Sequence, residues 1–135
     1  MGADRLIYFR TDGNSRIATG HLARCLSIAK ACQSLGMRIC FLLSGKESAD
    51  TLLRILPNTG SGLSENEVRV LRTAAFDDLD RELSEISALL GASPKDTVYF
   101  VDSYYVTGTY LEALRPLAKT AVLDDLQLFD YPADL

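Results

Sequence analysis

The feature that most constrains how this chain can fold is a regular alternation of short apolar segments with amphipathic ones. Candidate strands lie at Leu6–Arg10, Arg38–Leu43, Val68–Leu71, Thr97–Val101 and Thr120–Leu123. Candidate helices lie between them, at His21–Leu35, Ser48–Ile55, Asp77–Leu90 and Thr109–Ala118. Strands separated by helices favour a parallel sheet with helices packed on both faces. The sequence therefore predicts an α/β fold with a doubly wound parallel sheet.

Two of the candidate helices carry clear apolar stripes. In the first, apolar side chains recur every three or four residues, at Leu22, Cys25, Leu26, Ala29, Cys32 and Leu35. Gly36 follows directly and is a typical helix terminator. The helix expected at Asp77–Leu90 has Leu79, Leu83, Ile86 and Leu90 on one face. This spacing indicates that both helices pack against the sheet through a single face.

Composition excludes several classes of protein. A chain of 135 residues has the length of one domain, and 47% apolar with 24% charged residues is typical of a folded protein. The net charge is −4 and basic residues form no run, which argues against nucleic acid or an anionic membrane as a partner. Apolar runs such as Ile39–Leu43 are too short to span a bilayer.

The three cysteines favour packing over chemistry. Cys25, Cys32 and Cys40 are odd in number and form no C-x-x-C pair, which argues against a disulfide framework or a zinc site. We interpret them as small apolar residues of a protein in the reducing cytoplasm. We expect no bound metal and no cofactor.

Polar residues follow the predicted strands. Arg10, Thr11, Asp12, Gly13, Asn14 and Ser15 come at and after the first, Asp102, Ser103 and Tyr104 after the fourth, and Asp124 and Asp125 after the last. Open parallel sheets bind ligands beyond the carboxyl ends of their strands, so we expect these residues to converge. Ordinary turn and cap chemistry is the alternative reading of Asp102 and Asp125. A receiver-type signalling domain is a further alternative, but such domains carry their acidic pair after the first strand. In this chain the acidic pair, Asp124 and Asp125, follows the last predicted strand.

His21 is the only histidine of the chain, and it begins the first predicted helix directly after Gly20. The positive field of a helix N-terminus disfavours imidazolium, and a neutral imidazole can accept a proton from water as a general base. The alternative is a capping or core-edge histidine without a catalytic role. The Gly13–Gly20 loop has neither G-x-x-x-x-G-K-[ST] nor G-x-G-x-x-G, so it matches no standard phosphate loop.

Three segments together resemble one enzyme family. Phe9–Leu26 is similar to the pattern F-R-x-D-G-x-x-x-I-G-x-G-H-x-x-R-C-L, with Ala18 in place of the first glycine of I-G-x-G-H. The other two matches are Val101–Tyr104 with Tyr110, Leu111 and Leu114, and Leu123–Leu126 running on to Tyr131–Leu135. The pattern resembles that of the UDP-2,4-diacetamido-2,4,6-trideoxy-β-L-altropyranose hydrolases of pseudaminic acid biosynthesis and the related spore coat polysaccharide biosynthesis proteins.

The resemblance implies the N-terminal half of a GT-B-type fold, in which two Rossmann-like domains face a cleft. It implies that His21 activates a water that attacks the anomeric carbon of a UDP-sugar with inversion, without a metal. Gly20 would leave room for the reacting carbon. The substrate-binding residues implied are Arg10, Asp12, Gly13, Asn14 and Ser15, with Asp102, Tyr104 and Asp125 at the rim of the site.

The uridine and diphosphate contacts of this family lie mainly in its second domain, and we expect that nucleotide-binding C-terminal domain to be absent from residues 1–135. We therefore expect this chain to fold but to hydrolyse no UDP-sugar at a useful rate by itself. Two alternatives remain open at this stage. One is a glycosyltransferase of the same fold that uses His21 in the same role, and the other is a non-catalytic binding module.

Overall fold

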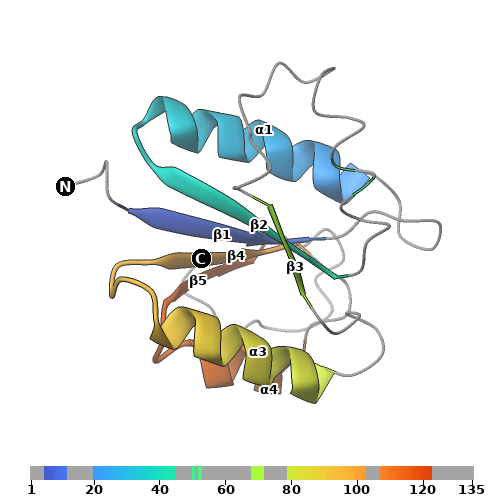
Figure 1. The fold of residues 1–135 in the computed structure, drawn as a ribbon, viewed down its shortest axis with the longest axis vertical. Coiled ribbons are helices and arrows are strands. Elements are labelled where there is room, and N and C mark those ends of the chain that lie inside the picture. The colour runs from blue at the N-terminus through green and yellow to red at the C-terminus, as the bar shows by residue number, and fades with distance from the viewer. Residues whose placement is uncertain are drawn as a thin grey trace.

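The computed structural model describes residues 5–11, 20–44, 50, 52, 68–71, 79–102 and 107–122. These residues form a five-stranded sheet with the order β3-β2-β1-β4-β5 (Figure 1). The strands are β1 (Leu6–Arg10), β2 (Arg38–Ser44), β3 (Val68–Leu71), β4 (Val98–Val101) and β5 (Lys119–Val122). Each neighbouring pair is parallel. The predicted α/β fold with a parallel sheet is therefore confirmed.

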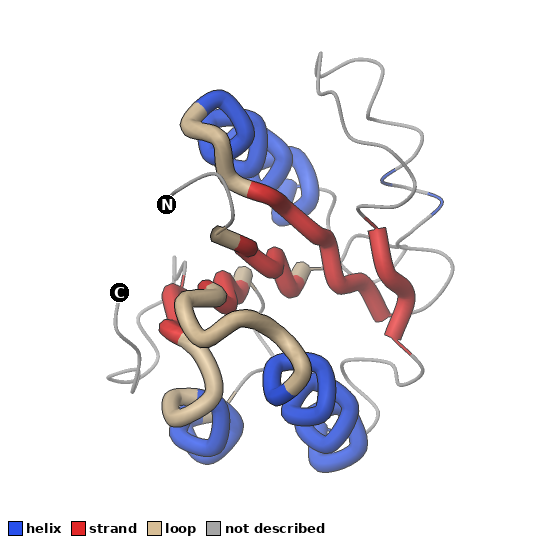
Figure 2. Tube along the Cα trace, turned by 60° about the vertical axis from the view of Figure 1, so that its left-hand side comes forward, coloured by secondary structure: helices blue, strands red, loops and turns tan. Residues whose placement is uncertain are grey.

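Helices cover both faces of this sheet, as the alternation of the sequence predicts. Helix α1 (Gly20–Ser34) lies on one face, and α3 (Leu79–Gly91) and α4 (Gly108–Leu114) lie together on the other (Figures 1 and 2). From β1 the sheet extends through β2 to β3 on one side, and β4 and β5 continue it on the other side. The order of the strands therefore reverses between β1 and β4, which is the position where doubly wound sheets bind their ligands.

The sheet is apolar on both faces because it separates two cores. Ile7 and Phe9 of β1 pack in the core beneath α1, where the Phe9 and Phe41 rings stack with centroids 5.3 Å apart. Tyr8 belongs to the second core, which also holds Tyr99 and Leu111 and lies beneath α3 and α4. Successive residues of a strand point to opposite faces, so β1 contributes to both cores.

The ends of the helices follow from particular residues. Gly36 has a positive φ of 85°, and its N–H donates to the Gln33 carbonyl while that of Met37 donates to the Cys32 carbonyl. These two bonds form a Schellman motif, so the predicted terminator is confirmed. Helix α4 ends at Leu114, four residues before its predicted end at Ala118, because Pro116 has no N–H to donate and cannot continue a helix.

Two other expectations can be compared with the described residues only in part. Of the helix expected at Ser48–Ile55, Asp50 and Leu52 are described, and both are helical. The first two residues of the helix expected at Asp77–Leu90 lie outside the described residues. The described part of this helix, α3, begins at Leu79. No helix in the part of the chain that the structure describes is long and apolar enough to cross a membrane.

Candidate functional site

The carboxyl ends of β1 and β4 lie side by side at the point where the strand order reverses. The N–H of Asp102, just after β4, donates to the Arg10 carbonyl at 3.0 Å, which extends the β1–β4 ladder by one residue. Thr11, just after β1, donates its N–H to the Leu42 carbonyl at 3.3 Å and is fully buried. We call the region formed by Thr11, Asp102 and the first two turns of α1 the switch-point site.

The structure describes some of the predicted site residues and leaves others outside. Gly20 and His21 form the start of α1, as predicted. Asp12, Gly13, Asn14, Ser15, Tyr104 and Asp125 lie outside the described residues, and so do the surroundings of the His21 side chain. Arg10 and Asp102 are described in full, and their side chains are found in quite different surroundings.

Asp102 is joined to α1 by a bidentate ion pair. Arg24 donates from Nε to Asp102 Oδ2 at 2.7 Å and from Nη2 to Oδ1 at 2.8 Å. The Asp102 side chain is 1% exposed, whereas that of Arg24 is 34% exposed. The pair therefore has its carboxylate inside the protein and its guanidinium at the surface of the switch-point site.

The Cys25 thiol also contacts the Asp102 carboxylate, with its Sγ 3.7 Å from Oδ2. Burial and the nearby negative charge of Asp102 raise the pKa of this thiol far above its ordinary value of 9.0. Cys25 is therefore a protonated, apolar residue near neutral pH and not a nucleophile. Cys32 and Cys40 likewise form no disulfide in the structure.

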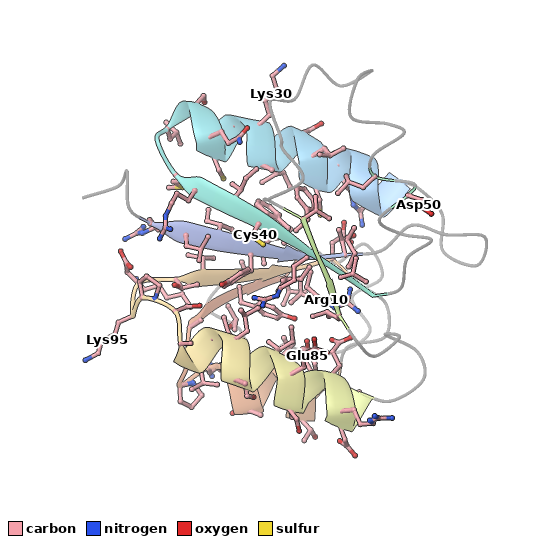
Figure 3. All side chains as sticks on the ribbon, in the orientation of Figure 1. Arg10, Lys30, Cys40, Asp50, Glu85 and Lys95 are labelled. Carbon is pink, nitrogen blue, oxygen red and sulfur yellow. The ribbon has the colours of Figure 1, made fainter. Side chains whose placement is uncertain are left out.

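Arg10 lies on the opposite face of the sheet from the Arg24–Asp102 pair. Its side chain is 1% exposed and lies between the sheet and α3 (Figure 3). Its Nη2 donates to Glu82 Oε1 at 2.7 Å, and its Nη1 donates to the Thr11 and Leu42 carbonyls at 3.1 and 3.4 Å. The resemblance implies a substrate contact for Arg10, whereas these bonds direct its guanidinium into the core.

Glu82 connects Arg10 to two tyrosines and so completes a buried polar cluster. Its Oε2 accepts from the Tyr110 hydroxyl at 2.6 Å, and the hydroxyls of Tyr110 and Tyr99 lie 2.5 Å apart. Burial is the main reason that the pKa of Tyr110 is raised well above 10.0, and the neighbouring Tyr99 and Glu82 raise it further. The tyrosine therefore stays a neutral donor, and the cluster joins β1, β4, α3 and α4.

Neither Arg24, the partner of Asp102, nor Glu82, the partner of Arg10, is among the residues predicted from the sequence. One signal was present for each. Arg24 stands one helical turn after His21, so it falls at the same end of α1 as the predicted base. Glu82 is four residues before Ile86, so it falls on the apolar face of the predicted helix, where a carboxylate needs a partner.

Among the described residues, no group of three or more His, Cys, Asp or Glu side chains is placed to hold a metal ion. Comparison with protein-family models, with curated proteins and with solved structures gave no match for this chain.

Proposed function

We propose that this chain is the N-terminal, Rossmann-like domain of a GT-B-type nucleotide-sugar hydrolase that cleaves a UDP-diacetamido-trideoxy sugar at the anomeric carbon with inversion. This reaction would belong to the cytoplasmic synthesis of nonulosonic acids or other bacterial surface polysaccharides. The observation that carries the proposal is the reversal of strand order between β1 and β4, with α1 beginning at Gly20 and His21. Ligands of open α/β sheets bind at this position.

The orientation of α1 supports His21 as the base. Arg24 and Cys25 contact Asp102, so the helix face that carries positions 24 and 25 is turned toward the end of β4. Residues three and four apart are neighbours on a helix, so position 21 belongs to that same face. The proposed base therefore belongs to the helix face that borders the switch-point site.

The proposed reaction needs one base and one leaving group. The imidazole of His21 accepts a proton from water as the water oxygen forms a bond to the anomeric carbon. The bond from that carbon to the diphosphate oxygen breaks, and its electron pair leaves with UDP. Asp12, Gly13, Asn14, Ser15 and Gly20 would border the sugar, with Tyr104 and Asp125 at the rim.

In this proposal Arg10 and Asp102 act from behind the sugar site. Arg10 binds the Thr11 carbonyl and so holds the residue that precedes Asp12 in the chain. Asp102 binds Arg24 and so holds α1. Because Arg10 and Asp102 are each only 1% exposed, they fit the role of holding neighbouring residues in place better than direct contact with the sugar.

The test is the variant His21→Asn in the complete gene product, whatever its length, with UDP-2,4-diacetamido-2,4,6-trideoxy-β-L-altropyranose as substrate. Loss of a general base is expected to lower kcat by about 100-fold or more. Lys30→Ala is the matched control, because Lys30 lies on the same helix and points away from the sheet (Figure 3). UDP release and free sugar are measured together.

Three results would contradict the proposal, and each would indicate a different function or mechanism. UDP release that depends on an added acceptor indicates a glycosyltransferase. Unchanged turnover in His21→Asn removes His21 from the mechanism. UDP-sugar binding without turnover in the wild-type protein indicates a binding module.

A further inference from the structure

The carboxylate of Asp102 is the point at which α1 is fixed to the end of β4. Its backbone is held on the sheet by the bond from its N–H to the Arg10 carbonyl. Its side chain, 1% exposed, accepts two N–H bonds from Arg24 and lies in contact with the Cys25 thiol. Two consecutive residues of one helix thus converge on one buried carboxylate.

This contact is unlike the apolar packing of the rest of α1. Cys25, Leu26 and Ala29 already bury their side chains against β1 and β2 and hold the helix to the sheet. An ion pair with a buried carboxylate adds little net stability over well-packed apolar residues, because the carboxylate loses its hydration. A bidentate pair of arginine and carboxylate does fix distance and orientation, since two parallel bonds allow one arrangement. Apolar packing therefore attaches α1 to the sheet, and the Arg24–Asp102 pair mainly fixes the rotation of α1 about the helix axis.

The rotation matters most one turn nearer the N-terminus. Position 21 precedes Arg24 by three residues, which is about 4.5 Å along the helix axis and a neighbouring position on the same face. A small rotation of α1 at Arg24 is transmitted to position 21, because the helix is continuous from Gly20 to Ser34. The position of the proposed base therefore depends on the Arg24–Asp102 pair.

We propose that Arg24 and Asp102 are positioning residues, which fix the first turn of α1 so that His21 meets the reacting centre. The inference rests on the proposed function in that it takes His21 as the base. The inference goes beyond that function by assigning a role to two further residues that would contact neither the sugar nor the attacking water. Arg24→Lys retains the charge but loses the fork, and Asp102→Asn retains the shape but loses the charge, so both variants test the geometry.

The kinetic test uses the complete gene product and the UDP-sugar named above. Arg24→Lys is expected to lower kcat by about tenfold to 100-fold, because a displacement on the order of 1 Å at a reacting group can cost ~100-fold in rate. KM is expected to change by less than about threefold, since ground-state binding is retained. Lys30→Ala on the same helix is the control.

A double variant separates positioning from general weakening of the fold. If Arg24 acts through His21, then Arg24→Lys adds nothing when His21→Asn is already present, so the two effects are not additive. A further loss in the double variant, similar to the loss in the single one, would overturn the proposal. So would a rise in KM with unchanged kcat, which indicates a direct substrate contact.

A second measurement does not depend on the enzymatic activity. His21 is the only histidine, so the 135-residue chain labelled with ¹³C-histidine and ¹³C-tyrosine gives one set of imidazole signals, which we call the His21 signal, beside the signals of its tyrosine rings. Arg24→Lys and Asp102→Asn are expected to shift this signal while the Tyr99 and Tyr110 signals on the other face stay in place. An unchanged His21 signal in both variants would overturn the proposal even if UDP-sugar hydrolysis is confirmed. A shifted signal in a chain without hydrolase activity would support the positioning and contradict only the proposed function.

Discussion

Replacing Glu82 with glutamine is expected to destabilise the fold more than any conservative surface change. Glu82 is 1% exposed and accepts bonds from Arg10 at 2.7 Å and from Tyr110 at 2.6 Å. Glutamine keeps the shape but leaves the Arg10 guanidinium buried beside a neutral group. Removing one partner of a buried ion pair typically costs about 3–5 kcal/mol, which is a large share of the ~5–15 kcal/mol that stabilises a domain.

Equilibrium unfolding in urea measures this loss. With a slope of about 1–3 kcal/mol per molar urea for a small domain, the unfolding midpoint of Glu82→Gln is expected to fall by roughly 2 M. The chain has no tryptophan, so far-UV circular dichroism follows unfolding of the helices. Glu112→Gln is the matched control, because Glu112 is exposed on α4 and its change is expected to stay within about 0.5 kcal/mol.

A double variant keeps the reasoning open to refutation if Glu82→Gln does not fold. Replacing both charges, with Arg10→Met and Glu82→Leu, leaves no unpaired buried charge and is expected to be more stable than Glu82→Gln. Part of the loss remains, because Arg10 also bonds to the Thr11 and Leu42 carbonyls. A double variant no more stable than the single one, or a loss below about 1 kcal/mol in Glu82→Gln, would refute the argument.

Two further predictions concern α4. Because the folded-state pKa of Tyr110 is raised well above 10.0, its contribution to stability is intact below pH 10 and is lost as the pH rises beyond that value, by up to about 1.4 kcal/mol per pH unit. Urea unfolding between pH 8 and 11 is expected to show a shallower alkaline loss in Tyr110→Phe, and equal slopes would contradict this. The Thr107 side chain caps α4 by accepting a hydrogen bond from the Tyr110 N–H at 3.2 Å. Thr107→Ala is therefore expected to lower the free energy of unfolding by about 1 kcal/mol in the same assay. Thr109→Ala is the control, because Thr109 is exposed and makes no such cap.

The central strands β1 and β2 could be predicted from the sequence almost to the residue, because strands buried on both faces require nearly continuous apolar runs. Val68–Leu71 has the predicted bounds, and the bounds of β4 and β5 differ by one residue from prediction. The predicted end of α4 at Ala118 was wrong by four residues, because Pro116 ends the helix although apolar residues continue beyond it.

The polar pairs could not be predicted in the same way, because they depend on which face of each element is inward. Arg10 and Glu82 are 72 residues apart, and Arg24 and Asp102 are 78 apart. The sequence predicts that Asp102 directly follows the fourth strand, and the structure has it at the carboxyl end of β4. The sequence did not indicate that a residue of α1, Arg24, would pair with Asp102, because that pairing depends on the rotation of the helix.

Two ion pairs with a buried carboxylate lie at the same end of the sheet and on opposite faces. Arg24–Asp102 joins α1 to β4, and Arg10–Glu82 joins β1 to α3. At the other end of β1 and β4, Arg5 and Asp96 form an exposed pair at 3.8 Å, a geometry that contributes little. Burying charge at the carboxyl end costs hydration that apolar residues would not lose, so stability alone does not explain its placement there. Under the proposed function, a fixed orientation would explain it, because the carboxyl ends of β1 and β4 border the switch-point site, whose residues would be held in one arrangement.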